Sequence, residues 1–587
     1  MTGGTTRVWA PAAARVDLHL PAAGEVRPMA RGEGGWWTAP GLAHGTDYAF
    51  AIDGGAPRPD PRSAWQPAGV HAPSRTFDAA RHRWADAAWA GRDVRGSVVY
   101  ELHIGTFTAA GTLDAAADRL DHLADLGVDM VELMPVAAFP GEHGWGYDGV
   151  GLYAVHEPYG GPAALQRFVD AAHGRGLAVC LDVVHNHLGP SGNYLGEFGP
   201  YFTERHRTPW GPAVNLDGPD AAEVRAFVLD SVVRWLRDFH VDALRLDAVH
   251  TLADDSPRHL LAEMSDVVAE LAADLGRPLS LVAESDLNDP RTVTPTAQGG
   301  RGMTAQWADD VHHALHTVLT GEHHGHLVDF GSTADLAHAL RRVFVVDGRA
   351  SLFRGGPWGR PVPPGTDGHR FVVCASNHDQ VGNRALGDRP SASSSPGVLA
   401  ASATLVLTSA FTPMLFMGEE WGAYTPFLFF TDHAEPWLAQ AVREGRAAEF
   451  GGADWTGIYG HEVHVPDPQA PASFTASRLD WTEAAEPGHR RLLDWYRCLI
   501  ALRRAEPALG DGDLDRVSVV HGEAWLVMSR GDLRVVVTWG DGPQEVPVDG
   551  AAPGTTDVLA AWDPVLVTVG TVTLPGPGGA VVRVPPS

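Results

Sequence analysis

The stretch VDALRLDAV, residues 241–249, has the pattern of a buried parallel strand that ends in charged residues. Apolar side chains fill most of it, as expected for a strand that is covered on both faces. An amphipathic segment precedes it at 221–239, and the apolar residues of that segment recur three and four positions apart, which is typical of a helix. This order of helix and strand predicts one unit of a parallel β/α fold.

The same alternation extends in both directions along the chain. Helix-like segments, such as 114–127 and 163–176, separate further apolar runs. The eight candidate strands are 97–104, 128–136, 177–184, 241–249, 279–285, 304–310, 371–377 and 413–420. Eight alternations favour a closed (β/α)8 TIM barrel over an open sheet, and polar residues at the carboxyl ends of its strands are then the first candidates for an active site.

The segments on either side of the barrel have a different pattern, so we expect a multidomain protein of α/β and all-β parts. Residues 1–93 contain short alternating runs between Gly- and Pro-rich turns, which predict an N-terminal β-sandwich, immunoglobulin-like and similar to carbohydrate-binding domains. Short runs return in 507–587 and predict a C-terminal β-sandwich domain. The catalytic barrel would span 94–506, with insertions at about 188–219 and 421–485. The first insertion is long enough to form a lid or a small subdomain.

Charge and composition exclude several functions. The chain of 587 residues has 44 basic and 72 acidic residues, a net charge of −28, which repels nucleic acid and anionic membranes. It contains no lysine, so a phosphate-loop lysine and a Schiff-base lysine are both excluded. Its three scattered cysteines argue against a disulfide framework. Because the N-terminus also lacks the pattern of a signal peptide, we expect a cytoplasmic protein.

Carboxylates gather at the predicted strand ends. Arg245 and Asp247, two residues apart, point to the same side of their strand, and the arginine would keep Asp247 ionised as a nucleophile requires. Glu284 follows three apolar residues, where partial burial would raise its pKa towards that of a proton donor. Asp379, after another strand, could stabilise an oxocarbenium-like transition state. Any one of these residues alone is more often structural, as a surface ion pair or a helix cap.

Four strand-end segments together resemble the signature regions of the α-amylase superfamily of glycoside hydrolases. They are DVVHNH (182–187), DALRLDAVH (242–250), LVAESD (281–286) and ASNHDQ (375–380). The resemblance implies a retaining glycoside hydrolase in which Asp247 is the nucleophile, Glu284 the proton donor and Asp379 the transition-state stabiliser. It also implies sugar contacts from His187, Arg245, His250 and His378. GWGYDG (144–149) is similar to another segment of the superfamily, in which Tyr147 would stack on the sugar and Asp148 would support it.

Three further segments resemble one family within that superfamily, the malto-oligosyltrehalose trehalohydrolases. They lie at 305–325, 377–389 and 429–450. The resemblance implies hydrolysis of the α-1,4-glucosidic bond next to the terminal trehalose unit of malto-oligosyltrehalose, with release of trehalose. The residues it places near the trehalose side are Asp309, Asp310, His313, Gln380 and Asn383. Trp210 could stack on the trehalose, although core packing is nearly as good an interpretation. A maltooligosyltrehalose synthase would supply the substrate, without any indication of direct contact.

Two other functions remain open from the sequence. A glycogen-branching enzyme of the same superfamily would use the same carboxylates to transfer a chain, and a non-catalytic glycan-binding protein could keep the barrel without the chemistry. The presence of all three carboxylates counts against the second. We predict no metal and no cofactor, because HEVH (461–464) lacks the two-residue gap of a zinc-binding H-E-x-x-H motif, and Asn186 alone does not make a calcium site.

Overall fold

A computed structural model describes residues 4–450, 458–459, 461 and 463–585. At its centre, eight parallel strands form a closed barrel in which each strand pairs with the next one in the chain and the last pairs with the first. These strands are β8 (Val99–Leu102), β9 (Met130–Leu133), β12 (Ala178–Val183), β15 (Ala243–Leu246), β16 (Ser280–Ala283), β17 (Ala305–Trp307), β20 (Phe371–Cys374) and β21 (Thr412–Phe416). Seven of the predicted apolar runs contain one of them, and the run 413–420 overlaps β21, which begins one residue earlier, so the predicted TIM barrel is confirmed.

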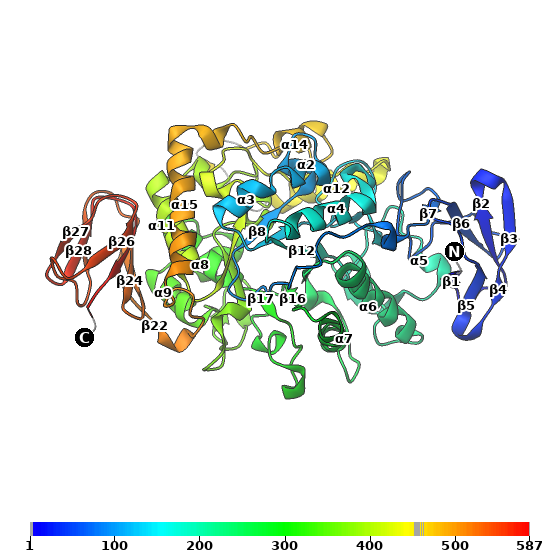
Figure 1. The fold of residues 1–587 in the computed structure, drawn as a ribbon, viewed down its shortest axis with the longest axis horizontal. Coiled ribbons are helices and arrows are strands. Elements are labelled where there is room, and N and C mark those ends of the chain that lie inside the picture. Colours follow the sequence, from blue (N-terminus) through cyan, green and yellow to red (C-terminus); the bar gives the residue numbers. More distant parts are fainter. Residues whose placement is uncertain (1–3, 451–457, 460, 462, 586–587) are drawn as a thin grey trace.

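Helices surround this barrel in the order that the alternating pattern predicts (Figure 1). The longer ones are α4 (Gly161–His173), α6 (Ala221–Asp238), α7 (Leu260–Leu275), α8 (Asp309–Thr320), α11 (Pro396–Thr408) and α15 (Pro487–Ala505). The single helix expected at 114–127 is wrong, because the chain forms α2 (Leu113–Ala117) and α3 (Leu120–Leu126) with a break between them. The break lets apolar residues of both pieces, such as Leu113 and Leu123, remain buried.

Antiparallel sheets lie at the two ends of the molecule, with the barrel between them (Figure 1). The N-terminal pair comprises β1 (Thr5–Trp9), β5 (Trp36–Pro40) and β4 (Ala30–Arg31) in one sheet, and β3 (Glu25–Pro28), β2 (Val16–Leu20), β6 (Asp47–Ile52) and β7 (Ser74–Arg75) in the other. The C-terminal pair comprises β22 (Val517–His521), β23 (Trp525–Arg530), β24 (Leu533–Thr538), β29 (Gly578–Arg583) and β26 (Asp557–Ala561), with β25 (Gln544–Pro547), β28 (Thr571–Leu574) and β27 (Leu566–Thr568). The boundaries at 93/94 and 506/507 stay our proposal for the domain division.

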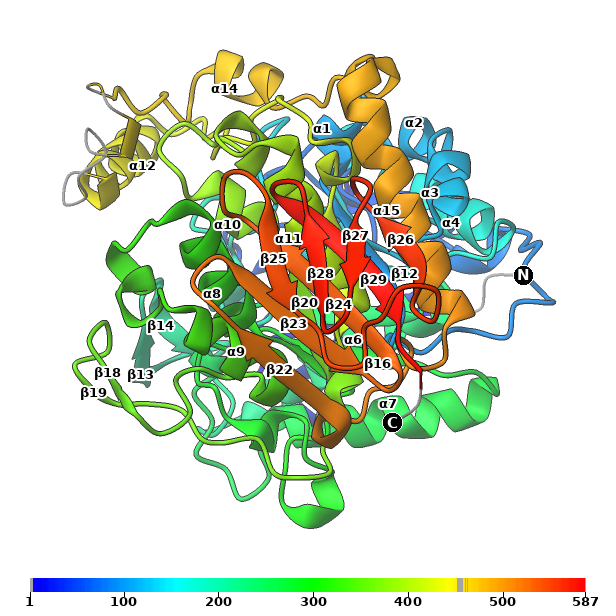
Figure 2. The same ribbon diagram turned by 90° about the vertical axis from the view of Figure 1, so that its left-hand side faces the viewer.

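Three long connections form the surroundings of the barrel mouth. The first contains α5 (Leu195–Phe198) and the hairpin β13 (Phe202–Thr208) and β14 (Gly211–Val214). The second contains α12 (Pro436–Phe450) and α14 (Pro471–Ala476); part of the 421–485 insertion and Glu462 of HEVH lie outside the described residues. The third, which we did not predict, is the hairpin β18 (Ala350–Ser351) and β19 (Gly356–Pro357). Figure 2 shows α12 and both hairpins on the same side of the barrel.

No helix within the described ranges has the length and apolar character needed to span a membrane.

Candidate functional site

Arg245, on β15, forms the centre of the charged cluster at the barrel mouth. Its guanidinium donates from one nitrogen to Asp182, at 2.8 Å, and to Asp247, at 2.9 Å, and the other terminal nitrogen lies 2.8 Å from Glu284. These carboxylates come from or directly follow three neighbouring strands, β12, β15 and β16. Burial alone would lower the pKa of Arg245, but the surrounding carboxylates raise it well above its ordinary value. One buried cation therefore holds three acidic groups in a fixed arrangement.

Asp247 lies at the end of β15 with its carboxylate at the edge of a cleft. One oxygen accepts from Arg245, and the other accepts from the side-chain amide of Asn186 at 2.8 Å. The same amide nitrogen donates to the backbone carbonyl of Asp247 at 2.7 Å, so the residue is held at two points. Both side-chain contacts are hydrogen bonds to the carboxylate oxygens, so they fix the orientation of the Asp247 side chain. Its side chain is only 11% exposed, which leaves little freedom to rotate away from the cleft.

A strained turn directs the backbone towards Glu284. Ala248 has a positive φ of 39°, which is rare for a residue with a side chain. Its amide donates to the Glu284 carboxylate at 2.8 Å, and the amide of Val249 donates to the Glu284 carbonyl at 3.0 Å. Burial raises the pKa of Glu284 and the charge of Asp247 adds to the effect, while Arg245 opposes it. Glu284, with its raised pKa, thus lies beside the fixed carboxylate of Asp247. A proton donor and a nucleophile require this arrangement.

Asp379 and His378 begin the short helix α10 (His378–Gly382), directly after β20. The Asn377 side chain caps this helix by accepting from the amide of Gln380 at 2.8 Å. Asp379 accepts from Asn383 at 3.2 Å and has a side chain that is 35% exposed in the cleft. His378 is buried behind it, with Nε2 at 3.4 Å from Asp379. The local sequence N-H-D-Q therefore places one carboxylate at the surface and one imidazole beneath it.

Aromatic side chains form the opposite wall. Tyr147 stacks against His378 with ring centroids 5.2 Å apart, and its hydroxyl donates to Asp182 at 2.7 Å. His187 lies 3.1 Å from the Tyr147 carbonyl, and Trp210 stacks on His187 with ring centroids 4.1 Å apart. Trp210 is 51% exposed, so it lies on the cleft edge rather than in the core. The β13–β14 hairpin thus carries an aromatic ring to the barrel mouth.

These groups line one cleft of about 560 Å³. It brings together most of the residues singled out from the sequence: Tyr147, Asp148, His187, Trp210, Asp247, His250, Glu284, His378, Asp379 and Asn383. The same cleft includes residues that we did not predict, namely Trp145, Phe429, Thr431, Val442, Arg446 and Glu449. Arg446, on α12, donates to Asn383 at 3.1 Å and so ties the second insertion to the end of α10. These residues lie in segments 144–149 and 429–450, which we singled out by resemblance, but no local pattern indicated that α12 would reach the strand ends.

A smaller pocket continues from this cleft past Glu284. Its lining includes Asp309, Asp310 and His313 together with Asp286 and Arg354. His250, in the first cleft, lies 3.6 Å from Asp286, and Arg354 contacts the same carboxylate at 2.6 Å, so the two pockets adjoin. We did not predict Asp286 or Arg354, although Asp286 is the last residue of the segment LVAESD (281–286) that we quoted.

The neighbouring residues Asp309 and Asp310 of this pocket differ in their surroundings. Asp310 accepts from the amides of Val345 and Val346 and from the Asn288 side chain, so it fixes the chain before the β18–β19 hairpin. Burial raises the pKa of Asp309 to about 7, and the nearby charges of Glu284 and Asp379 add to this effect. Gln380, also expected on this side, lines neither pocket in the described part of the chain.

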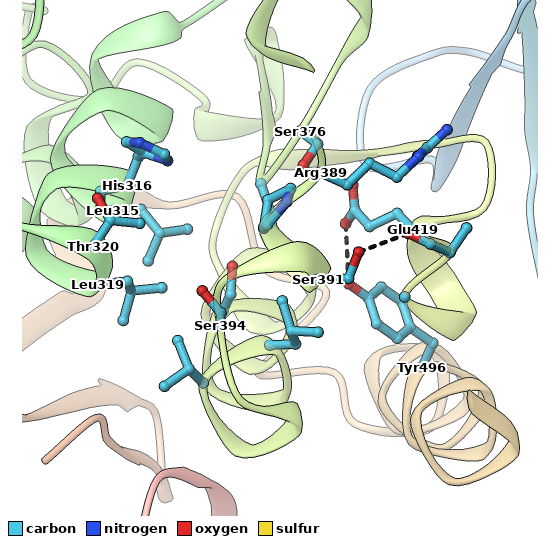
Figure 3. Close-up of a pocket in the computed structure, with 17 residues that line it drawn as sticks. Leu315, His316, Leu319, Thr320, Ser376, Arg389, Ser391, Ser394, Glu419 and Tyr496 are labelled. Carbon is cyan, nitrogen blue, oxygen red and sulfur yellow. Dashed lines mark hydrogen bonds between the residues drawn. The ribbon is translucent and has the colours of Figure 1, made fainter. Parts of the chain in front are cut away.

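Another cavity, of about 50 Å³, lies between the barrel and helices α8, α11 and α15 (Figure 3). Glu419 in its wall accepts from the Tyr496 hydroxyl at 3.0 Å, and burial raises the pKa of Glu419 to about 8. None of the candidate catalytic carboxylates lines it. Its contacts are those of a structural junction between barrel and helices.

One group within the described ranges has the spacing of metal ligands: His206, Asp217 and Asp255, whose ligand atoms lie within 4.8 Å of one another. Arg205 lies 3.6 Å from Asp217 and 3.4 Å from Asp255, so an arginine already supplies positive charge there. These contacts attach the β13–β14 hairpin to the loop that follows β15. The absence of a metal stays a prediction.

Comparisons with known proteins indicate the family of the chain. The family model described as "Alpha amylase, catalytic domain" matches residues 77–207. The chain is 52% identical to malto-oligosyltrehalose trehalohydrolase from Arthrobacter ramosus, over 98% of this chain and 99% of the relative. It is 51% identical to the protein of the same name from Rhizobium sp. (strain M-11), over 99% of this chain and 98% of the relative.

A more distant relative and a solved structure also match the chain. A 1,4-alpha-glucan branching enzyme from Thiobacillus denitrificans is 31% identical over 52% of this chain and 47% of its own length. Among solved structures, a putative alpha amylase from Salmonella typhimurium superposes with a TM-score of 0.89 and 37% identity, over 99% of this chain and 97% of that chain. The similarity to the trehalohydrolases thus extends over the sheets at both ends as well as the barrel.

Proposed function

The chain belongs to the malto-oligosyltrehalose trehalohydrolases, within the α-amylase superfamily, and we propose that it cleaves the α-1,4-glucosidic bond next to the terminal trehalose of malto-oligosyltrehalose, releasing trehalose and a maltooligosaccharide. The observation that carries this proposal is the Arg245 cluster, which holds a nucleophile candidate and a proton-donor candidate at one cleft. The protein is accordingly a glycoside hydrolase, and the assignment of roles to its residues is our proposal.

In the first step, an Asp247 carboxylate oxygen attacks the anomeric carbon of the glucose at the cleavage site. The bond from that carbon to the trehalose oxygen breaks, and Glu284 gives its proton to the departing oxygen. The raised pKa of Glu284 favours the protonated form that this step consumes. The product is free trehalose and a maltooligosaccharide bound covalently to Asp247.

In the second step, water replaces the trehalose. Glu284, now a carboxylate, takes a proton from the water. At the same time the water oxygen attacks the anomeric carbon, and the bond from that carbon to Asp247 breaks. Two inversions at the same carbon return the α configuration, so the enzyme retains the anomeric form. Glu284 ends the cycle protonated and Asp247 ends it ionised.

Both transition states place positive charge on the sugar ring. Asp379, exposed in the cleft, would face this charge and hold sugar hydroxyls, while the ring of Tyr147 would lie against the sugar face. The adjoining pocket with Asp309, Asp286 and Arg354 would receive the trehalose. Its carboxylates and guanidinium can bind the several hydroxyls of a disaccharide that has no reducing end.

A branching reaction needs the same carboxylates but replaces water by a second glucan. The similarity to a branching enzyme covers about half of this chain, at 31% identity, whereas the trehalohydrolases match nearly all of it. A binding protein without chemistry would have no need for the contacts that hold Asp247 and Glu284 together. Hydrolysis is therefore the better supported function.

Product analysis tests this proposal. Wild type and Asp247→Asn are each incubated with maltotriosyltrehalose and, separately, with maltopentaose. We expect wild type to release trehalose and maltotriose from the first substrate and to leave the second nearly intact, while the variant releases neither product. Lengthened or branched glucans would instead indicate transfer, and full activity of the variant would remove Asp247 from the mechanism.

We further propose that the enzyme acts in the cytoplasm, in trehalose biosynthesis, on the product of a maltooligosyltrehalose synthase. Cys180 and Cys374 are buried and free, and Cys498 is exposed and free, which fits a reducing compartment. The printed names of the relatives support the place in trehalose metabolism. Subcellular fractionation with an antibody to the chain tests the location, and copurification with the synthase tests direct contact.

A further inference from the structure

Glu101 is a buried carboxylate on the first barrel strand that contacts His378 at two points. One of its oxygens lies 2.5 Å from His378 Nδ1, and the other accepts from the backbone amide of His378 at 2.9 Å. Both side chains are 1% exposed. The pair therefore fixes the imidazole ring and the first residue of α10 at the same time, across 277 residues of chain.

The other ring nitrogen of His378 also faces oxygen atoms. Nε2 lies 2.8 Å from the Tyr147 hydroxyl and 3.4 Å from Asp379. The Tyr147 hydroxyl donates its proton to Asp182, at an oxygen that also accepts from Arg245, so towards His378 the hydroxyl is an acceptor. Both nitrogens of the ring thus face acceptors, and a neutral imidazole, which has one N–H, cannot serve both.

Several titratable or charged groups surround the His378 ring. Those that act on His378, or on which His378 acts, are Glu101 on β8, His103, Glu132 on β9, Asp182 on β12, Arg245 on β15, Glu284 and Asp379. Carboxylates outnumber the cations in this set. Burial lowers the pKa of His378, but Asp379 and Glu101 outweigh it and raise the pKa to about 10.

We propose that Glu101 is a positioning residue that holds His378 as a doubly protonated imidazolium beneath the cleavage site. The imidazolium lies 3.4 Å from Asp379 and orients it, so that the Asp379 carboxylate faces the positive charge that develops on the sugar. Glu101 itself does not touch the substrate, because His378 and Tyr147 lie between it and the cleft. This inference rests on the proposed hydrolysis.

Glu132 provides a matched control. It lies opposite Glu101 in the register of β8 and β9 and is 2% exposed, so both carboxylates share one buried layer. Within the described residues, its Oε1 atom has no hydrogen-bond partner. Burial, together with the charges of Glu101 and Asp182, raises the pKa of Glu132 to about 8, so it is mostly protonated at neutral pH. Glu132→Gln should therefore change little, whereas Glu101→Gln removes a charge.

The first experiment compares the pH dependence of kcat/KM for wild type, Glu101→Gln and Glu132→Gln on maltotriosyltrehalose. We expect Glu101→Gln to lose about 10²-fold in kcat/KM near neutral pH, the size typical for one preorganised electrostatic contact. The higher alkaline limb, which His378 sets near pH 10 in wild type, should also move down by about one pH unit or more, because His378 then loses its proton more easily. Glu132→Gln should keep the wild-type profile. Equal behaviour of the two variants would overturn the proposal.

A second measurement does not depend on the activity of a variant. In wild type labelled with ¹⁵N-histidine, a nitrogen–proton spectrum at pH 8.5 should contain an imidazole with both ring nitrogens protonated whose signal disappears in His378→Gln. A neutral ring at His378 in wild type would overturn the proposal whether or not Glu101→Gln folds. If wild type showed the imidazolium but released no trehalose, the proposed function would fail while the charge state of His378 stood.

Discussion

At the scale of single residues, Arg245 decides how the site is held together. It contacts Asp182, Asp247 and Glu284, and its side chain is 0% exposed. A planar guanidinium can serve several carboxylates at fixed angles, which a single ammonium cannot. The loss of its charge would also leave the buried Asp182 without its cation.

This predicts different outcomes for two substitutions. Arg245→Lys keeps the charge but cannot span Asp247 and Glu284, so kcat should fall by about 10²-fold with a modest loss of Tm. Arg245→Met removes the charge from a buried ion cluster, which typically costs about 3–5 kcal/mol, so its Tm should fall much further. Steady-state kinetics and thermal unfolding followed by circular dichroism check both. Equal Tm values for the two variants would contradict the account of the cluster.

The raised pKa of Glu284 sets a direction for pH dependence. Its protonated form is required in the first step, so activity is present below this pKa and falls as the pH rises through it. We predict that Glu284→Gln loses about 10²–10⁴-fold in kcat, the usual contribution of general acid catalysis. The residual activity of this variant should lack the limb that Glu284 sets and should keep only the higher limb that His378 sets near pH 10.

Asp309 is the appropriate control for that prediction. Burial raises its pKa too, in this case to about 7. Asp309→Asn should keep the alkaline limb of wild type and change mainly KM, since Asp309 lies in the adjoining pocket. A pH–rate profile of each variant distinguishes the two acids. If the limb vanished in Asp309→Asn and persisted in Glu284→Gln, the proton donor would have been assigned wrongly.

Residues near strand ends could be found from the sequence for a physical reason. Side chains alternate along a strand, and all strands of the barrel end at the same edge. The directions of Arg245, Asp247 and Glu284 could therefore be predicted. No such pattern marked Glu101. It lies within a strand rather than at its end, and a single acidic residue in an apolar run does not indicate a functional role. Asp310 lines the adjoining pocket, where a substrate contact stays a prediction, and one of its oxygens accepts from two backbone amides of the chain before a hairpin.

At the scale of elements, the β13–β14 hairpin brings Trp210 to the cleft. The ring lies parallel to His187, with an angle of 8° between the planes, and it is half exposed. The contacts of Arg205 and His206 with Asp217 hold the base of the hairpin. The hairpin therefore presents a flat apolar surface beside the cleavage site, which suits the face of a sugar.

We predict that Trp210→Ala raises KM for maltotriosyltrehalose about three- to tenfold with little change in kcat, the equivalent of ~0.7–1.4 kcal/mol of stacking. The control is Tyr424→Ala, since Tyr424 is 61% exposed and lines neither of the two adjoining pockets. Initial-rate kinetics over a range of substrate concentrations measure both. An unchanged KM in Trp210→Ala would mean that the ring serves only to cover His187.

The sequence predicted the helices better than the segments around the barrel mouth. Periodic apolar residues mark α4 and α6 because each helix buries one face against the barrel. The β18–β19 hairpin has two residues in each strand and so leaves no periodic signal. Its position follows instead from Asp310, which accepts from the amides of Val345 and Val346, and such a contact between distant segments cannot be read from local pattern.

At the scale of the whole molecule, helix α11 joins the barrel to the C-terminal sheets. It is apolar on all sides because it packs against β24 and β29 on one side and α15 on another. Arg530, on β23, reaches this junction and donates to the carbonyls of Thr408, Leu509 and Asp511. Its side chain is buried, so these contacts are shielded from water.

We predict that Arg530→Met lowers the Tm by about 1–3 °C, since lost hydrogen bonds from a charged donor cost roughly 1.5–3 kcal/mol and leave buried carbonyls unpaired. Kinetics at 25 °C should stay close to wild type because Arg530 lies outside the cleft. Arg516→Met, at a side chain that is 75% exposed, should leave the Tm nearly unchanged. A loss of activity without a change in Tm would show that this junction acts on the site.

The overall division into barrel and flanking sheets was accessible from the sequence, because the spacing of apolar runs differs between parallel and antiparallel structure. The packing of α11 against the C-terminal sheet could not be predicted from the sequence. A helix that is apolar all round indicates burial but does not name the partner, and the partner here, β29, is about 170 residues further along the chain.

The central claim is that Asp247 and Glu284 carry out retaining hydrolysis at the bond next to trehalose. Time-resolved ¹H NMR of maltotriosyltrehalose with wild type tests bond, product and stereochemistry together. We predict that free trehalose and the α-anomer of maltotriose appear at equal rates, with the β-anomer forming only later by mutarotation. Initial release of β-maltotriose, or of glucose or maltose in place of trehalose, would contradict the account.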